Sequence, residues 1–412
     1  MSACPFNNPL DPNAYGNGMP YHELKKVRER GPLVWFEDPF NGVPFWMVTR
    51  REECDFISKS PKLFSSFEKL AHCGEQDEEG INNSRLVFLN MDPPQQMKHR
   101  RLVRDVFTPT AVNSYEPRFR EIAKQVVDAV AQRGECEFVR EVAAELPLIA
   151  MLEMVDVPAS ERQQFFEWTN LMFFSDDPDS DTGQPEAKQA SIDMIMYALD
   201  LAAKHRTNPK DNLLDRLVDA EVDGEAISDG EFGMIFLTLI TAGNDSTRTA
   251  ISQGMRLLME NPDQIDYLIE NPDKIDNAVE EILRYNTSFI TMRRTAMEDV
   301  ELAGQTIKKG DKVVMHYPAI NHDEHVFGDD SMTFDVRRAE RMPSLYKEHR
   351  AFGIGQHFCL GTHLARLEIK IMLEEVLPRL RNPQFVGEPN YIKSFFVNGM
   401  HNMHIKFDTE AA

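Results

Sequence analysis

The most constraining feature of the sequence is a long, mainly apolar segment of about 28 residues, from Phe232 to Met259. At about 1.5 Å per residue it would form a helix of roughly 42 Å, long enough to cross a domain. Because apolar residues occupy almost every side of this helix, we expect it to be buried at the centre of the fold.

The middle of this segment, residues 241–247, is a polar stretch with a glycine, Thr-Ala-Gly-Asn-Asp-Ser-Thr. Buried polar groups and a glycine inside a helix both lower stability unless a site uses them. The stretch therefore favours a helix that is opened to face a ligand. A solvated kink or a local hydrogen-bond network is the alternative.

Most of the chain between residues 93 and 283 has helical periodicity, and a further helix is expected at 361–380. The dipeptides that predict helix boundaries are Thr108-Pro109, Asn208-Pro209 and Asn261-Pro262. The segments that predict strands are 33–36 and 45–49 as a hairpin, 300–304, 312–316 after a Lys309-Gly310 turn, and 403–407. Because strands come from both ends of the chain, we predict one mainly helical domain over residues 1–412, with a small sheet region and an N-terminal tail of about 1–19.

The charge balance narrows the class of partner. With 45 basic and 67 acidic residues the net charge is −22, which argues against nucleic acid or an anionic membrane as the main partner. The N-terminus lacks a basic-then-apolar signal pattern, and no run approaches the roughly 18 apolar residues of a membrane span. We therefore expect a cytoplasmic protein.

The cysteines are odd in number and widely scattered, and no two of them form a CxxC pair. They are Cys4, Cys54, Cys73, Cys136 and Cys359. This pattern fits a reducing compartment and speaks against both a disulfide framework and a zinc site. Four of them are best explained as small apolar side chains. Cys359 differs from the others because of its neighbours.

Residues 352–361 are Phe-Gly-Ile-Gly-Gln-His-Phe-Cys-Leu-Gly. Three glycines allow tight turns and close approach of the backbone to a flat ligand. A helix expected directly after the cysteine points its positive end at the sulfur and stabilises a thiolate. A nucleotide-binding glycine motif is one alternative, but Phe358 stands at its third glycine and no strand precedes it. An ordinary glycine-rich turn with an incidental cysteine is the other.

This loop resembles the haem loop of the cytochrome P-450 family, and every fixed position of the family form Phe-Gly-x-Gly-x-His-x-Cys-x-Gly is filled. The resemblance implies the P-450 fold, with haem between a long central helix and the cysteine-bearing loop. It implies heme b (iron protoporphyrin IX) with Cys359 as the iron ligand. The other loop residues implied to surround the haem are Phe352, Gly353, His357 and Gly361.

The resemblance extends over nearly the whole chain and implies more haem contacts. Those outside the loop are Gln96, Arg100, Ala242 and Arg294. Arg100 and Arg294 match propionate-binding arginines, although a solvated surface charge is the alternative for either alone. Gln96 stands where the family often has histidine, so one propionate contact is weaker or replaced.

A second motif concerns structural support. Glu281 and Arg284 match the family's Glu-x-x-Arg pair, and Arg338 matches the arginine of its Phe-Asp-x-x-Arg segment. Residues at i and i+3 share one helix face and can form an ion pair. Such a pair alone is more often a surface bridge worth about 0.3 kcal/mol. The implied role of the three residues is support for the cysteine loop.

The resemblance also implies the reaction, insertion of one oxygen atom of O2 into an unactivated C–H bond. Asp245, Ser246 and Thr247 match the acid-alcohol motif of the central helix, with Ser246 in place of the usual threonine. An acid-alcohol pair with ordered water can relay protons to the distal oxygen. The serine is a freer rotor, so coupling is in doubt and Thr247 is a second candidate.

Electrons are expected from NAD(P)H through a separate ferredoxin or flavodoxin, because the chain lacks the cysteine spacing of an iron–sulfur cluster. The basic residues expected to dock the ferredoxin are Lys98, Arg101, Arg104, Lys347 and Arg350, beside His99 and Arg100. A solvated helix face is the alternative for this cluster.

The expected substrate is an apolar small molecule such as a steroid, terpenoid or branched lipid. The residues expected to contact it are Thr238, Thr241, Phe289, Ile290, Met292, Phe396 and Val397, with further contributions from 86–89 and 173–174. Each alone is better explained as core; together they indicate a site that recognises shape. A peroxygenase that uses H2O2 and a haem gas sensor are the rival functions.

Overall fold

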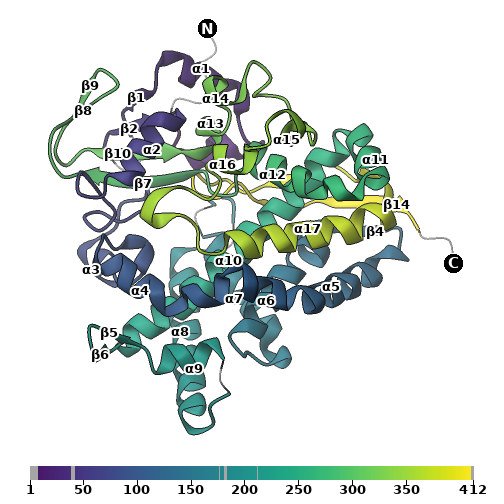
Figure 1. Ribbon diagram of the computed structural model, residues 1–412, viewed down its shortest axis with the longest axis horizontal. Helices are drawn as coiled ribbons and strands as arrows, with labels where there is room; N and C mark the ends of the chain where they lie inside the picture. The colour runs from purple at the N-terminus through teal and green to yellow at the C-terminus, as the bar shows by residue number, and fades with distance from the viewer. Residues whose placement is uncertain (1–7, 39–41, 176, 181–182, 211, 410–412) are drawn as a thin grey trace. The chain divides into compact units, whose positions relative to one another are not determined.

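The computed structural model describes residues 8–38, 42–175, 177–180, 183–210 and 212–409, and it is mainly helical (Figure 1). The chain divides into two compact units, each assembled from segments far apart in the sequence. Unit 1 comprises Met1–Gln96, Asn277–Cys359 and Tyr391–Gly399; unit 2 comprises Met97–Asp276, Leu360–Asn390 and Met400–Ala412. The single domain over 1–412 stays a prediction, and Cys4 lies outside the described residues.

Unit 1 is built on a five-stranded sheet in the order β1-β2-β10-β7-β3. Its strands are β1 (Leu33–Phe36), β2 (Phe45–Val48), β10 (Lys312–His316), β7 (Thr291–Ala296) and β3 (Phe64–Ser65). The predicted hairpin is confirmed, with Leu33 opposite Val48 in an antiparallel pair. β2 and β10 pair in parallel, so segments from both ends of the chain share this sheet.

Both faces of this sheet are covered, because alternate residues of a strand point to opposite faces. Phe45, Met47 and Val314 pack with Leu24 of α1 (Tyr21–Arg30) on one face. Val48, Val313 and Met315 pack with Cys54 and Ile57 of α2 (Arg51–Lys59) on the other. The remaining helices of unit 1 are α3 (Glu78–Ser84), α13 (Tyr317–Ile320), α14 (Glu324–Phe327), α15 (Arg338–Arg341) and α16 (Leu345–Glu348).

The strand predicted at 300–304 is shorter in the structure and is followed by a strand that was not predicted. β8 (Val300–Leu302) and β9 (Gln305–Ile307) form a separate small hairpin that turns at Ala303 and Gly304. Both turn residues have positive φ, +50° and +74°. The predicted turn at Lys309-Gly310 follows this hairpin and leads into β10, so the prediction missed one strand.

Unit 2 is a bundle of helices with a three-stranded sheet in the order β11-β14-β4. Its helices are α5 (Pro109–Ala131), α6 (Glu145–Met154), α7 (Arg162–Phe173), α8 (Gln184–Thr207), α9 (Leu213–Val218), α10 (Asp229–Met259), α11 (Pro262–Glu270) and α17 (Thr362–Arg379). Its strands are β4 (Glu135–Glu137), β5 (Glu221–Val222), β6 (Glu225–Ala226), β11 (Arg381–Phe385), β13 (Met400–Asn402) and β14 (His404–Asp408). Three elements contain residues of both units: α4 (Gln95–Arg104), α12 (Ile275–Tyr285) and β12 (Asn390–Tyr391).

The predicted central helix is α10, and α6, α8 and α17 pack against it. It begins three residues earlier than predicted, because Ser228 and Glu231 form a capping box. The Ser228 hydroxyl accepts from the Glu231 N–H at 3.2 Å, and the Glu231 carboxylate accepts from the Ser228 N–H at 2.8 Å. The three predicted helix stops are confirmed: the helical segment begun by α4 ends at Phe107, α8 ends at Thr207 and α10 ends at Met259.

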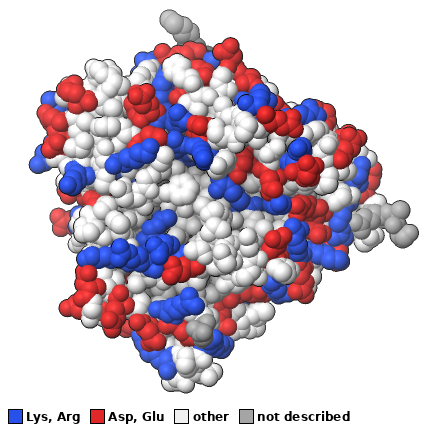
Figure 2. Space-filling model, viewed as in Figure 1, with Lys and Arg blue, Asp and Glu red and all other residues white. Residues whose placement is uncertain are grey.

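The surface carries charge of both signs. On the face drawn in Figure 2, lysine and arginine side chains are interspersed with aspartate and glutamate side chains. Within the described residues, no helix is both long and apolar enough to cross a membrane.

Candidate active site

The loop before Cys359 is fixed by backbone hydrogen bonds and glycines. The Cys359 N–H donates to the Phe352 carbonyl at 2.9 Å. Gly353 and Gly355 have φ of +66° and +76°, a region that side chains disfavour. A Cβ on Gly355 would lie 2.5 Å from the Ser58 carbonyl oxygen, so glycine alone lets the loop approach α2 this closely.

Cys359 differs from the other described cysteines in its exposure. Cys54, Cys73 and Cys136 are buried, and burial raises the pKa of Cys54 and of Cys136 to about 12. Their thiols are therefore inert, as predicted. Cys359 is partly exposed and stands three residues before α17, whose positive end favours a thiolate.

Arg294, on β7, is a buried cation with no anionic hydrogen-bond or ion-pair partner among the described residues. Its side chain is 5% exposed, and its one hydrogen bond to a described residue goes to the Arg293 carbonyl at 2.6 Å. Burial lowers the pKa of its guanidinium. Because a buried cation is costly without a counter-charge, this position fits an anionic group such as a haem propionate.

Two further predicted haem contacts, His357 and Gln96, lie in unit 1. The Asp92 carboxylate accepts from the Ser66 N–H at 2.8 Å, and the Ser66 hydroxyl lies 3.2 Å from Nε2 of His357. The Gln96 amide donates to the Gln356 carbonyl at 2.9 Å, while its buried Oε1 has no partner among the described residues. Arg100, partly exposed, follows Gln96 by one turn of α4.

These residues fit a haem. The Gln96 Oε1 has no hydrogen-bond partner among the described residues, and the buried Arg294 cation bonds only to a backbone carbonyl there. A Cβ on Gly361 would meet nothing within 4 Å, so the described residues give no steric reason for that glycine. When bound, the haem would supply oxygen binding and activation, with Cys359 as its thiolate ligand.

One stripe of α10 stays accessible while its other sides are buried. The partly or fully exposed residues of this stripe are Met234, Leu237, Thr238, Thr241, Ala242 and Ser246. Their spacing of three and four residues places them on one face. The hydroxyls of Thr238 and Thr241 donate to the carbonyls of Met234 and Leu237, so this face is mainly apolar.

The expectation that α10 opens at residues 241–247 is wrong, because the helix is continuous there. Gly243 serves packing instead: a Cβ at this position would lie 2.7 Å from the Met151 sulfur of α6. The polar residues Asn244 and Asp245 form the local hydrogen-bond network that was the alternative. The Asn244 amide donates to Asp245 at 3.1 Å and to Thr169 at 3.4 Å.

Asp245 and Ser246 have different surroundings. Asp245 is 7% exposed and forms an ion pair with Arg248 at 3.2 Å. Burial raises the pKa of its carboxyl to about 7, although Arg248 opposes the rise. The Ser246 hydroxyl donates to the Ala242 carbonyl at 2.8 Å and lies on the accessible stripe. An acid that titrates near neutral pH and an accessible alcohol are thus adjacent.

Thr247 lies on the opposite, buried side of α10, near Glu368 of α17. It therefore does not share the accessible face of Ser246. Glu368 is fully buried, and burial raises the pKa of its carboxyl well above the usual range, although the Thr247 side chain opposes the rise. Glu368 was not among the predicted site residues. The signal was its i, i+4 spacing from the apolar Leu364 and Met372.

Glu281, Arg284 and Arg338 are in direct contact and fully buried within unit 1. Arg284 forms two hydrogen bonds with the Glu281 carboxylate, both at 2.7 Å, and Arg338 reaches the same carboxylate at 3.1 Å. Arg284 also donates to the carbonyls of Asn321, Ser331 and Thr333. The cluster cross-links distant segments of unit 1; its support of the cysteine loop stays a prediction.

The residues predicted to contact substrate fall into two groups. In unit 1, Phe289 and Phe396 are partly exposed and their rings lie 5.0 Å apart, and Met292 is also partly exposed. Ile290 and Val397 are buried, so they are core residues next to these accessible side chains. The Ile290 N–H donates to the Phe396 carbonyl at 2.7 Å. In unit 2, Thr238 and Thr241 lie on the accessible stripe of α10.

The predicted docking residues differ in exposure and in ion pairing. Arg350 is wrong as a surface residue: it is 5% exposed, pairs with Asp55 at 2.6 Å and donates to three backbone carbonyls. Lys98 pairs with Asp223, and Arg104 with Asp105. Arg101, Arg104 and Lys347 are exposed.

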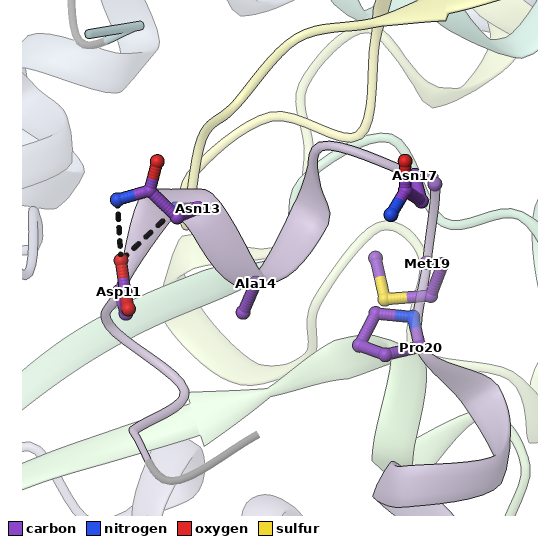
Figure 3. Close-up of a pocket in the computed structure, with 7 residues that line it drawn as sticks. Asp11, Asn13, Ala14, Asn17, Met19 and Pro20 are labelled. Atoms are coloured by element: carbon purple, nitrogen blue, oxygen red, sulfur yellow. Dashed lines mark hydrogen bonds between the residues drawn. The ribbon is translucent and has the colours of Figure 1, made fainter. Parts of the chain in front are cut away.

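A further cavity lies in the N-terminal segment of unit 1 (Figure 3). Its lining residues are Asp11, Asn13, Ala14, Asn17, Gly18, Met19 and Pro20. None of them is a predicted site residue, so this cavity is separate from the residues described above.

Comparison with known proteins agrees with this geometry. Residues 59–390 match the family Cytochrome P450. The chain is 36% identical over 408 residues to the steroid C26-monooxygenase of Rhodococcus jostii (strain RHA1), covering 97% of this chain and 84% of that protein. It is 30% identical over 403 residues to the linalool 8-monooxygenase of Pseudomonas putida, covering 96% and 97%. The Mycobacterium marinum cytochrome P450 CYP268A2 in complex with pseudoionone has a similar structure, with a TM-score of 0.86 at 33% identity over 94% of each chain.

The chain therefore belongs to the cytochrome P450 family and is a P450 monooxygenase. The predicted fold class and the predicted heme b cofactor are confirmed, because the family and its fold neighbours are haem-thiolate proteins.

Proposed function

We propose that this monooxygenase hydroxylates an apolar small molecule of the steroid, terpenoid or branched-lipid class. The observation that carries the proposal is the accessible stripe of α10, where two threonine hydroxyls are turned to their own backbone and leave an apolar surface. Within unit 1, the partly exposed Phe289, Met292 and Phe396 present aromatic and thioether surface of the same apolar kind. Such a lining selects by shape and supplies few polar anchors.

The names of the relatives support the same substrate class. One relative is a steroid C26-monooxygenase, another acts on linalool, and the similar solved structure contains pseudoionone. All three names denote apolar molecules with branched carbon chains or rings.

The proposed roles in proton delivery follow from the two environments on α10. Asp245, with a pKa of about 7, can hold a proton on its carboxyl at neutral pH and release it. The Ser246 hydroxyl donates a hydrogen bond to the Ala242 carbonyl, so its oxygen is oriented to accept a hydrogen bond from a water molecule. That water would take up the proton that Asp245 releases. Cys359 would hold the iron of the haem, which would supply oxygen activation when bound.

Electrons are proposed to come from NAD(P)H through a separate ferredoxin. The basic residues proposed to dock it are Arg101 and Arg104 in unit 2 and Lys347 in unit 1, each exposed in an otherwise acidic chain. Arg350 is removed from the proposed set because it is buried.

The substrate is tested by adding cholesterol, linalool and a methyl-branched fatty acid to the ferric, haem-loaded protein. A ligand that displaces water from the iron converts the haem from low to high spin, which absorbance detects. Product is then measured with NADPH, a surrogate plant-type ferredoxin and its reductase. Absence of a spin change with all three molecules would contradict the substrate class. Product formation with hydrogen peroxide but not with NADPH would favour the peroxygenase instead.

A further inference from the structure

Arg248 is the one charged side chain in ion-pair contact with Asp245 among the described residues. It lies one turn further along α10 and is 2% exposed. Burial lowers the pKa of its guanidinium, and the Asp245 carboxylate opposes this effect. A buried arginine of this kind is held in place only if its remaining donors are satisfied.

The C-terminal part of α7 supplies a hydrogen-bond acceptor and an aromatic ring for the Arg248 guanidinium. Arg248 donates to the Asn170 side-chain oxygen at 2.7 Å. Its guanidinium carbon lies 4.4 Å from the centre of the Phe173 ring and 5.7 Å from that of Phe174. The Asn170 amide and the Phe173 ring of α7, with the ring of Phe174 directly after the helix, thus fix the arginine that contacts the acid.

These contacts continue beyond α7. The Phe174 ring lies 4.6 Å from the ring of His401 on β13, and His401 pairs with the buried Asp177 at 2.7 Å. The segment after α7 is therefore tied to β13 through Phe174, whose ring lies over Arg248. All of these residues belong to unit 2.

We propose that Arg248 is a positioning residue that holds the Asp245 carboxylate for proton transfer, and that the C-terminal end of α7 holds Arg248. This inference rests on the proposed role of Asp245. It makes proton delivery sensitive to the end of α7, a segment that need not touch the haem. Changes at Asn170, Phe173 or Phe174 then alter the use of electrons without altering the cofactor.

The test uses the haem-loaded full chain with NADPH, the surrogate ferredoxin and its reductase, and the ligand that gives the largest spin change. Arg248→Gln removes the cation and keeps an amide, and Arg248→Lys keeps the charge but loses the planar fork. Asn170→Ala removes only the α7 hydrogen bond. The matched control is Arg256→Gln, because Arg256 is also a mostly buried arginine of α10 but pairs with Glu260 at 2.6 Å.

We expect Arg248→Gln to slow NADPH turnover about tenfold, within the range of general acid effects. Arg248 opposes the rise that burial causes in the pKa of Asp245, so loss of this cation raises that pKa further. The decline of turnover at alkaline pH should then move up by about one pH unit or more. Arg248→Lys and Asn170→Ala should show smaller effects in the same direction, and Arg256→Gln should leave the pH profile unchanged.

The decisive control is the double variant with Asp245→Asn. If Arg248 acts through Asp245, adding Arg248→Gln to Asp245→Asn has no further effect on turnover or on the pH profile. An equal effect in both backgrounds, or an unshifted profile in Arg248→Gln, would overturn the positioning role while leaving the relay intact. If Asp245→Asn alone has no effect, the relay itself is wrong, and the role of Arg248 falls with it.

Discussion

The Glu368 carboxyl of α17 is fully buried beside the Thr247 side chain of α10 in the interior of unit 2, and among the described residues it has no cationic partner. Burial raises the pKa of this carboxyl well above its ordinary value of 4.5. The group therefore stays neutral in the folded protein at pH values where the unfolded chain has ionised it.

This relationship predicts a pH-dependent stability. Below pH 4.5 both states are protonated and the group makes no difference; as the pH rises toward the folded-state pKa, only the unfolded state loses its proton and stability falls. Glu368→Gln removes this loss. Its free energy of unfolding in urea should exceed that of the wild type by an amount that grows from pH 5 to pH 8.

The matched control is Glu375→Gln on the same helix. Glu375 is partly exposed and lies 3.7 Å from Arg379, so its removal should change stability little at any pH. A Glu368→Gln variant that is less stable than the wild type at pH 8 would show that the carboxylate is charged and paired.

The buried cluster of Glu281, Arg284 and Arg338 predicts a large stability loss. Arg338→Gln leaves the Glu281 carboxylate with one cation instead of two and should lower the free energy of unfolding by about 3–5 kcal/mol. Arg341→Gln is the control, because Arg341 is exposed and its ion pairs to Asp330 and Asp335 are worth at most about 1 kcal/mol. Equal urea midpoints for the two variants would contradict the structural role.

Cys359 is predicted to be the axial ligand. The reduced, carbon-monoxide-bound protein should show the strongly red-shifted Soret band of thiolate-ligated haem, and Cys359→His should lose it. Cys54→Ala and Cys136→Ala serve as controls, because burial keeps both thiols protonated. They should keep the band even where they lower stability. Retention of the band in Cys359→His would remove Cys359 as the ligand.

The long elements could be predicted from the sequence because periodicity and proline positions are local signals. They placed α10 and the C-terminal end of α8 within a few residues. The start of α10 was missed because its capping box lies in a polar stretch before the apolar run. The β8–β9 turn was missed because Ala303 adopts positive φ without the usual glycine.

Side-chain partners could not be predicted where they depend on residues far away in the chain. Arg350 was expected on the surface, but Asp55, 295 positions earlier, pairs with it and allows burial. Thr247 was expected to share the role of Ser246. One helical position rotates a side chain by about 100°, which is enough to move it from the accessible stripe to the interior.

The docking surface predicts a salt-dependent electron transfer. Arg104→Glu and Lys347→Glu should slow reduction by an acidic ferredoxin. They should also flatten the dependence of the rate on ionic strength, because the attraction that salt screens is no longer there. Lys204→Glu on α8 changes the net charge equally and is the control. Stopped-flow reduction rates at several salt concentrations measure the effect; unchanged rates in both variants would reduce the cluster to solvated surface.

Asp245 and Ser246 are predicted to fail in different ways. Asp245→Asn removes the carboxyl whose pKa is about 7, so NADPH turnover should fall about 10²-fold, and the decline of turnover above pH 7 should disappear. Ser246→Ala keeps the acid but removes the oxygen that orients water. It should keep NADPH consumption near normal while product falls and hydrogen peroxide rises.

Thr247 supplies the test of whether a second alcohol takes part. Because Thr247 is buried near Glu368, Thr247→Val should leave the ratio of product to NADPH unchanged, and the Ser246→Ala/Thr247→Val double variant should uncouple no more than Ser246→Ala. Additional uncoupling in the double variant would show that Thr247 reaches the relay. Full coupling in that variant would instead rule out a protein alcohol and leave water alone to carry the proton from Asp245.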